Sequence, residues 1–257
     1  DSHTFCTPEQ VEGIYDTLIG VVQEFYGTLG MKLRARLSYR DPAQKQKYLG
    51  EDALWDKAEG ILLAIAKKHD LDYYEAVGEA AFYGPKIDFM AVDALGREWQ
   101  VATPQLDFVQ PARFGLTYTD SDGQEKTPVM IHFALMGSIE RFLSVYIEHT
   151  AGVFPLWLAP TQVLFVPVAD RHTEFAKSLA QEFRSQKIRA DVDDADETVG
   201  NKIRKAAKEK IPYVVVVGDK EVAGEEWMVR VRGKEEQEKM GKDACMERIM
   251  REIRERT

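Results

Sequence analysis

Apolar residues recur three or four positions apart over residues 7–30, and this spacing predicts an amphipathic helix. Thr7 and Pro8, with Gln10 at the third position after the threonine, are typical of a helix start. A second apolar stripe predicts a helix over about 52–69. The first stripe is formed by Val11, Ile14, Tyr15, Leu18, Val21, Val22 and Phe25, and the second by Leu54, Ala58, Ile61, Leu62 and Ile65.

Strand-like segments dominate the stretch around and after the second helix. Residues 32–39 alternate between apolar and polar side chains, and the Asp122-Gly123 dipeptide resembles a hairpin turn ahead of a strand at 127–133. Further strands are predicted at 73–77, 85–94, 97–108 and 114–120. Successive strands flanked by helices predict an antiparallel α+β domain.

The pattern changes after Pro160. Strands are predicted at 161–169, 188–193, 213–219 and 227–232, and helices at 173–186, 198–210 and 243–255, the last capped by Asp243. Continuous apolar strands that alternate with amphipathic helices are typical of a mostly parallel, helix-covered sheet. We therefore expect a domain boundary near 158–161, with one domain over 1–158 and an α/β domain over 159–257.

Composition fits a folded protein of one large or two medium domains, since 44% of the 257 residues are hydrophobic and 30% are charged. No apolar run approaches the ~20 residues of a membrane-spanning helix. The opening DSHTFC has no signal-peptide pattern and no initiator Met, so we expect a processed, trimmed or excerpted sequence. Cys6 and Cys245 are too few for a disulfide framework, which favours a cytoplasmic location.

The net charge of −9 is unevenly distributed along the chain. Residues 161–257 contain 20 basic and 20 acidic side chains, whereas residues 1–160 contain 14 and 23. The chain has no basic tail or stripe of the kind that binds nucleic acid, so any RNA contact would depend on local sites.

The most informative segment is 128–160, where His132 precedes a small-residue turn at Gly137 and Ser138. Glu140 and Arg141 then open an apolar helix. Free backbone N–H groups and the helix dipole favour the anionic groups of a nucleotide at such a turn, and an arginine there can grip phosphate or stack on a purine. The alternative is a buried strand-to-helix corner with a surface arginine.

His3 and His132 each lie on a predicted strand, and two imidazoles from separate strands can share a metal ion. Zinc is the natural candidate for nitrogen ligands, but a catalytic zinc takes three protein ligands and one is missing here. The side chain of Cys6 is expected to face away from that of His3 along the strand. Structural roles for the two histidines remain the alternative.

Polar residues cluster around two further segments. Tyr83 and Lys86 flank a Gly-Pro turn, which could also be a plain hairpin corner. Gln100, Thr103 and Gln105 lie on one predicted strand, where polar side chains suit hydrogen-bond recognition of a small ligand. We expect Gln100 and Thr103 to join Gln105 at a pocket only if the backbone is irregular near Pro104; a solvated sheet face is the alternative.

Several common catalytic motifs have no match in the chain. It has no P-loop, Gly-x-Ser-x-Gly elbow, His-Glu-x-x-His or Cys-x-x-Cys pair, which argues against P-loop NTPases, serine hydrolases of that type, zincins and dithiol redox proteins.

Taken together, the segments resemble the threonyl-tRNA synthetases, a family of class II aminoacyl-tRNA synthetases. The resemblance covers essentially all 257 residues in collinear order. It rests on DSHTFCTPEQ (1–10), GEAAFYGPKIDF (78–89), WQVATPQLDF (99–108), PVMIHFALMGSIERF (128–142), FPLWLAPTQV (154–163) and VVVVGDKEV (214–222). It implies the C-terminal portion of an antiparallel class II catalytic domain, incomplete at its N-terminus, followed by an α/β anticodon-binding domain.

By this resemblance, His3 and His132 match two of the family's three zinc ligands, and the third, a cysteine, would precede Asp1. The family's zinc binds the amino and hydroxyl groups of threonine, which rejects valine because valine lacks the hydroxyl ligand. The resemblance also implies that Asp1 contacts the amino acid and that Tyr83, Thr103 and Gln105 form the threonine pocket. Ser138 would lie at the rim of this pocket. Lys86 and Gln100 would lie near the adenylate, and Arg141 would bind ATP.

The implied reaction is attack of the threonine carboxylate on the α-phosphate of ATP, assisted by Mg²⁺, and then transfer to the 3′ end of tRNA(Thr). Glu221 and Arg230 match anticodon-reading residues, and Asp196 stands where some members have asparagine. Phe133 replaces the usual arginine after the histidine, and Val101 replaces a small residue or cysteine. The implied partners are ATP, threonine and tRNA(Thr), and the implied assembly is a homodimer.

The first class II motif, the start of the second and the editing region have no counterpart in the sequence. We therefore expect an incomplete part of a threonine–tRNA ligase that is inactive alone. The alternatives are a non-catalytic, synthetase-like tRNA-binding or regulatory module, and a generic α/β interaction domain over 161–257.

Overall fold

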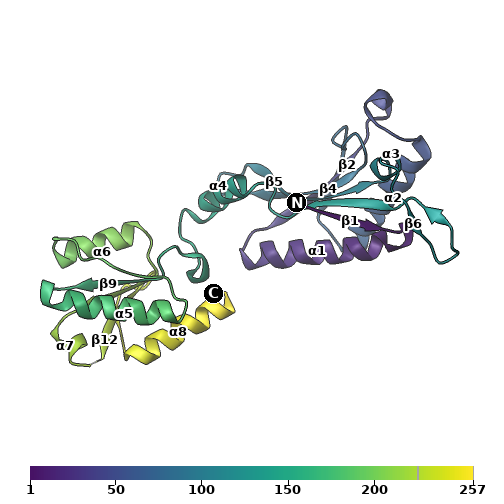
Figure 1. Cartoon of the computed structure of the whole chain (residues 1–257). Helices are drawn as coiled ribbons and strands as arrows, with labels where there is room; N and C mark the ends of the chain where they lie inside the picture. The colour runs from purple at the N-terminus through teal and green to yellow at the C-terminus, as the bar shows by residue number, and fades with distance from the viewer. Residues whose placement is uncertain (225, 257) are drawn as a thin grey trace. The chain divides into compact units, whose positions relative to one another are not determined.

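The computed structural model describes residues 1–224 and 226–256. The chain divides into two compact units, Asp1–His149 and Thr150–Thr257, and each has a sheet of its own (Figure 1). In the part of the chain that the structure describes, no helix combines the length and the apolar character needed to span a lipid bilayer.

The first unit is built on a six-stranded sheet in the order β1-β8-β5-β4-β2-β3. All neighbouring strands run antiparallel except the parallel pair β2 and β3, so the predicted antiparallel α+β domain is confirmed. The strands are β1 (Ser2–Cys6), β2 (Leu33–Tyr39), β3 (Tyr73–Val77), β4 (Lys86–Val92), β5 (Glu98–Asp107) and β8 (Val129–Ala134).

Two long helices, α1 (Val11–Thr28) and α2 (Asp52–Lys68), pack against each other, α1 also against β5 and β8 and α2 against β2 (Figure 1). A short 3₁₀ turn precedes α1, and the Thr7 N–H donates to the Gln10 side-chain oxygen at 3.0 Å, as the helix-start pattern predicts. The buried stripe of α1 is Val11, Tyr15, Ile19, Val22 and Tyr26, and that of α2 is Trp55, Ala58, Leu62, Ile65 and Ala66.

Three members of each predicted stripe are buried as predicted, and each buried face is rotated from the predicted one by less than one residue. Val21 and Leu54, which the apolar period places on the buried faces, are each 40% exposed. The apolar residues of both helices span more than one face, and contact with the sheet decides which of them are buried.

Two further local predictions are wrong. Residues 114–120 form a strand only at β6 (Tyr118–Thr119), which pairs with β7 (Glu125–Lys126) around the predicted turn, while the residues just before them form α3 (Gln110–Arg113). The final helix, α8 (Lys242–Glu255), is capped by Gly241, and Asp243 lies inside its first turn.

The second unit is a five-stranded sheet in the order β10-β9-β11-β12-β13. The pairs β10–β9 and β9–β11 are parallel, as predicted, whereas β12 and β13 extend the sheet in antiparallel fashion. The strands are β9 (Val163–Pro167), β10 (Ala190–Val192), β11 (Tyr213–Val217), β12 (Trp227–Val231) and β13 (Glu238–Met240).

Helices cover both faces of this sheet, which explains its nearly continuous apolar strands. One buried cluster joins Phe165 and Val215 to α5 (Thr173–Ser185) and α8, and a second joins Val166 and Val214 to α6 (Val199–Lys208). The remaining helices are α4 (Ile139–Thr150), which follows β8, and α7 (Asp219–Val222), which follows β11.

Candidate functional site

The two histidines singled out from the sequence face each other across a strand pair. His3 on β1 pairs directly with His132 on β8, and His132 pairs with Gln105 on β5. Directly opposed residues of neighbouring strands project from the same face of a sheet. The imidazole rings lie edge to face, with centroids 4.8 Å apart.

A cavity of about 200 Å³ opens at this point of the sheet. Six of its lining residues are candidates that the sequence singles out: Asp1, His3, Tyr83, Thr103, Gln105 and His132. Ser2, Phe133 and Ala134 complete the lining. The ring of Tyr83 lies 4.9 Å from that of His132, and the Tyr83 hydroxyl donates to the Gln105 side-chain oxygen. The cavity therefore offers imidazole, hydroxyl, amide and carboxylate groups to one small polar ligand.

His132 is held by a carboxylate on the neighbouring strand. Its Nε2 lies 2.9 Å from Oδ2 of Asp107, whose side chain is fully buried. Because a carboxylate only accepts hydrogen bonds, Nε2 carries the proton and Nδ1 of the neutral ring is left as an acceptor or metal ligand. This is the arrangement by which carboxylates orient metal-binding histidines.

The two imidazoles fit a shared zinc ion as far as a pair of ligands can. Zinc–nitrogen bonds of about 2.1 Å in tetrahedral geometry bring two ring nitrogens to about 3.4 Å, which is compatible with rings at this separation. Among residues 1–224 and 226–256, however, the structure contains no group of three or more His, Cys, Asp or Glu side chains arranged to hold a metal.

Tyr83 reaches the cavity because Gly84 packs directly on β5. A Cβ atom at Gly84 would lie 1.7 Å from the Leu106 carbonyl oxygen, so no other residue fits without movement of the backbone. The Leu106 N–H also donates to the Pro85 carbonyl oxygen at 3.0 Å. The Gly-Pro turn is thus a close backbone contact that places Tyr83 over Gln105.

The backbone irregularity expected near Pro104 lies instead at Val101, and it changes the direction of Gln100 and not that of Thr103. Thr103 and Gln105 share a face by the ordinary two-residue period of a strand, so the prediction is wrong for Thr103. The pairing of β4 with β5 shifts by one residue between Ala102 and Gln100, and this bulge at Val101 turns Gln100 to the same face. The Gln100 amide consequently donates to the Thr103 hydroxyl at 2.8 Å.

Lys86 and Gln100 do not line the cavity but meet beside it at one carboxylate. Asp88 on β4 is completely buried and accepts from the Lys86 ammonium at 2.7 Å and from the Gln100 amide at 2.8 Å. Asp88 and Asp107 are not among the candidates predicted from the sequence. A lone acid within an otherwise apolar strand, as in KIDFMAV and QLDF, is the signal that could have revealed both.

The turn after β8 forms a helix N-terminus. Gly137 has φ +64°, and the Ser138 hydroxyl accepts the Arg141 N–H at 3.2 Å, so Ser138 caps α4. The Arg141 side chain is exposed, and neither it nor Ser138 lines the cavity around His3 and His132.

The two positions that depart from the family pattern have different surroundings. Phe133 lines the cavity between Ser2 and Pro104, its register partners, and supplies an apolar wall where an arginine is usual. Val101 is 1% exposed inside the bulge, so its side chain belongs to the core.

The three anticodon candidates of the second unit lie in a loop, a short helix and a strand. Asp196 is exposed between β10 and α6, and Glu221 lies in α7, so both follow strands parallel to β9. Glu221 accepts the Gly218 N–H at 2.9 Å and thereby caps α7. Arg230 lies opposite Val214, near the start of β11, and its Nε is buried without a hydrogen-bond partner.

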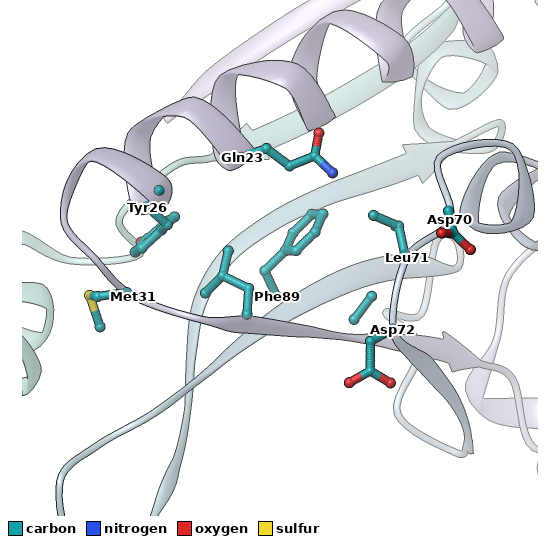
Figure 2. Close-up of a pocket in the computed structure, with 10 residues that line it drawn as sticks. Gln23, Tyr26, Met31, Asp70, Leu71, Asp72 and Phe89 are labelled. Carbon is teal, nitrogen blue, oxygen red and sulfur yellow. The ribbon is translucent and has the colours of Figure 1, made fainter.

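A larger cavity, of about 280 Å³, lies between the end of α1 and the start of β2 (Figure 2). Figure 2 shows Phe89 between Tyr26 on one side and Asp70 and Asp72 on the other. It contains none of the residues singled out from the sequence, and its lining has neither an imidazole nor a basic side chain. The cavity at His3 and His132 is therefore the better candidate for chemistry.

Comparisons with known proteins agree with this architecture. Residues 1–150 match the family model of the tRNA synthetase class II core domain (G, H, P, S and T), and residues 162–252 match that of the anticodon binding domain. Two curated relatives, both named threonine–tRNA ligase, are 45% identical over 98% of the chain (Rubrobacter xylanophilus) and 44% identical over 99% (Staphylococcus epidermidis). The chain spans 40% of the length of each.

A solved structure of similar fold is the RNA binding domain of threonyl-tRNA synthetase from Cryptosporidium parvum. It is 34% identical to the chain, with a TM-score of 0.88, and the match covers 96% of this chain and 62% of the other. The family model of the catalytic core covers more than half of the chain and coincides with the unit that contains the histidine cavity. The chain belongs to the class II aminoacyl-tRNA synthetases, in the family whose core domain is shared by the G, H, P, S and T enzymes.

Proposed function

We propose that this chain supplies the C-terminal portion of the catalytic domain and the anticodon-binding domain of a threonine–tRNA ligase. The observation that carries the proposal is the convergence of Asp1, His3, Tyr83, Gln105 and His132 on one small polar cavity. Its chemistry suits an amino acid that bears both an amine and a hydroxyl. The similarity to threonine–tRNA ligases supports the same substrate.

In this proposal the protein's groups bind and orient the amino acid. The Asp1 carboxylate pairs with the amino group of threonine, while Gln105 and Tyr83 hydrogen-bond its polar groups. His3 and His132 would hold a zinc ion that, when bound, supplies Lewis-acid coordination to the amine and hydroxyl. Valine lacks the hydroxyl, so polar groups arranged for threonine would be left unpaired.

Activation requires ATP with Mg²⁺ beside the amino-acid cavity. We assign Arg141 to the ATP, since a guanidinium can clamp phosphate or stack on adenine, and Ser138 to the rim of the pocket because it shapes the turn before α4. Lys86 and Gln100 lie next to the cavity and would contact the adenylate. Their contribution is positioning and electrostatic stabilisation of the in-line phosphoryl centre.

The second domain, over 159–257, would bind tRNA(Thr) through Glu221, Arg230 and Asp196. Arg230 has an unpaired buried donor and is the strongest of the three candidates. Cytoplasmic location and a homodimer belong to the same proposal.

Threonine-dependent ATP–pyrophosphate exchange tests the function. The full-length protein is expected to exchange with threonine and much less with valine, whereas the 257-residue chain alone is expected to be inactive. Exchange by the full-length protein with another amino acid in preference to threonine would overturn the substrate assignment. Robust exchange by the 257-residue chain would overturn the expectation that it is inactive alone.

The second candidate function is a non-catalytic tRNA-binding module. The observation that favours it is the compact unit that matches the anticodon-binding family. It predicts tRNA(Thr) binding without exchange by the full-length protein. Loss of that binding in Arg230→Ala, with retention in the Arg251→Ala control on α8, would exclude a generic protein-interaction domain over 161–257.

A further inference from the structure

The completely buried carboxylate of Asp88 accepts hydrogen bonds from side chains on three strands, and these bonds outnumber its lone pairs. Oδ2 accepts from Lys86 Nζ at 2.7 Å, Ser38 Oγ at 2.6 Å and Arg36 Nη2 at 2.9 Å. Oδ1 accepts from Gln100 Nε2 at 2.8 Å and Thr103 Oγ1 at 3.0 Å. With all its lone pairs used, Asp88 is a fixed acceptor that no ligand can approach.

Two of these donors, Lys86 and Gln100, are the side chains that the proposed function assigns to the adenylate, and a third, Thr103, lines the cavity proposed for threonine. We propose that Asp88 is a positioning residue for amino-acid activation, which fixes the direction and hydrogen-bonding polarity of these three groups. This inference rests on the proposed function.

The network determines the orientation of the Gln100 amide. Its nitrogen faces Asp88, which only accepts, and its oxygen faces Arg36 Nη2 at 3.0 Å, which only donates. A flipped amide would place donor against donor and acceptor against acceptor. Asp88 and Arg36 together therefore hold Gln100 in a single orientation.

The network also determines what Thr103 can offer to a ligand. Its only hydroxyl proton is given to Asp88, and it accepts the Gln100 N–H at 2.8 Å. Towards the cavity it can present only a remaining lone pair or its methyl group. Thr103 thus accepts from an ammonium or hydroxyl group and cannot donate to a carboxylate.

The negative charge of Asp88 also balances the positive charge of the Lys86 ammonium. Two cations, Lys86 and Arg36, contact Asp88, and the further carboxylate at Arg36, that of Glu79, lies 3.6 Å away and is half exposed. The Lys86 side chain is only 12% exposed. Asp88 is the carboxylate that the Lys86 ammonium contacts, so it stabilises this largely buried charge and holds the ammonium beside the cavity.

The test is Asp88→Asn in the full-length enzyme, with threonine-dependent exchange, KM for threonine and ATP, and tRNA(Thr) affinity as readouts. A hydrogen bond to a charged group contributes about 1.5–3 kcal/mol, so kcat for activation is expected to fall by about 10- to 100-fold. The Kd for tRNA(Thr) is expected to stay within about twofold of the wild-type value, since the anticodon-binding unit is unaltered.

Asp93→Asn is the matched control. Asp93 also has a fully buried carboxylate in the first unit, where it accepts from Arg97 Nε at 2.6 Å and Trp99 Nε1 at 2.9 Å, outside the Asp88 network. Its loss is expected to lower the melting temperature as much as Asp88→Asn does, without a change in kcat. Equal losses of kcat in the two variants, or unaltered kcat in Asp88→Asn, would overturn the inference.

Asp88→Asn removes the buried carboxylate that Arg36 and Lys86 share and can fail to fold. The double variant Arg36→Gln/Asp88→Asn also removes one of these two positive charges and is expected to recover stability while kcat remains low. Wild-type kcat in the double variant would show that Asp88 merely neutralises Arg36. If the wild-type enzyme itself lacks threonine-dependent exchange, the proposed function fails first, which separates the two failures.

Discussion

Asp107 joins the first turn of α3 to the imidazole of His132. Its Oδ2 lies 2.9 Å from His132 Nε2, while its Oδ1 accepts the N–H groups of Val109 at 2.8 Å and Gln110 at 2.9 Å. The backbone thus fixes the carboxylate, and the carboxylate fixes the ring. A histidine held in this way presents Nδ1 in one direction only.

Asp107→Asn is therefore expected to weaken zinc binding by the full-length enzyme about 10- to 100-fold, as loss of such outer-shell partners typically does. Competition between the protein and a chromophoric chelator measures the affinity directly. Asp41→Asn is the control, because Asp41 also accepts a backbone N–H, that of Ala43 at 2.9 Å, and lies outside the histidine cavity. Unchanged zinc affinity in Asp107→Asn would contradict this role.

Gly84→Ala is expected to destabilise the first unit by about 2–4 kcal/mol or to prevent folding, because the added Cβ meets a backbone carbonyl rather than a flexible side chain. Gly20→Ala, at an open position inside α1, is the control and is expected to stabilise by about 0.5–1 kcal/mol. Urea unfolding of both variants checks the signs. A destabilisation by Gly84→Ala no larger than about 1 kcal/mol would mean that the turn does not need its close approach to β5.

Arg141→Ala is expected to lower kcat/KM for ATP by at least about tenfold in the full-length enzyme, as its guanidinium would otherwise clamp or stack on the nucleotide. Arg141→Lys is expected to recover little, because an ammonium lacks the planar fork. Arg113→Ala, at an exposed position in α3, is expected to be neutral. Full recovery by lysine would show that charge alone matters.

Periodicity predicted the elements far better than it predicted their faces. The helices α1 and α2 and the strand β5 lie close to their predicted positions, because each is long. Which face of a helix is buried depends on how the helix packs against the sheet. This is why Val21 is exposed while Tyr26 is fully buried.

At the site, too, the sequence identified candidate residues better than it identified their contacts. The resemblance selected His3 and His132 by type, and their pairing in register supports the proposal that they act together. The bulge at Val101 and the hydrogen-bond partners of Asp88 and Asp107 depend on how neighbouring strands pair, which the pattern within a single strand does not encode. Arg230 on β12 and Glu221 in α7 likewise remain candidates.

The last prediction concerns the pH dependence of the second unit. Hydrogen bonds from Arg171 and then from His172 lower the pKa of Asp219 to about 2. His172 is buried, its Nδ1 accepts the Ala169 N–H at 3.2 Å, and its Nε2 lies 2.8 Å from Asp219 Oδ1. Since the pKa is lower in the folded state than the usual value of about 3.9, this carboxylate stabilises the fold above pH 4. The contribution is lost as the pH falls from about 4 towards 2.

Asp219→Asn should consequently lower the stability of the second unit at pH 7, and the difference from wild type should shrink between pH 4 and pH 2. Hydrogen exchange of the β9 and β11 amides reports on this unit separately from the first. A difference between Asp219→Asn and wild type that stays constant down to pH 2 would mean that the ionised carboxylate is not what links β11 to the Arg171-His172 turn.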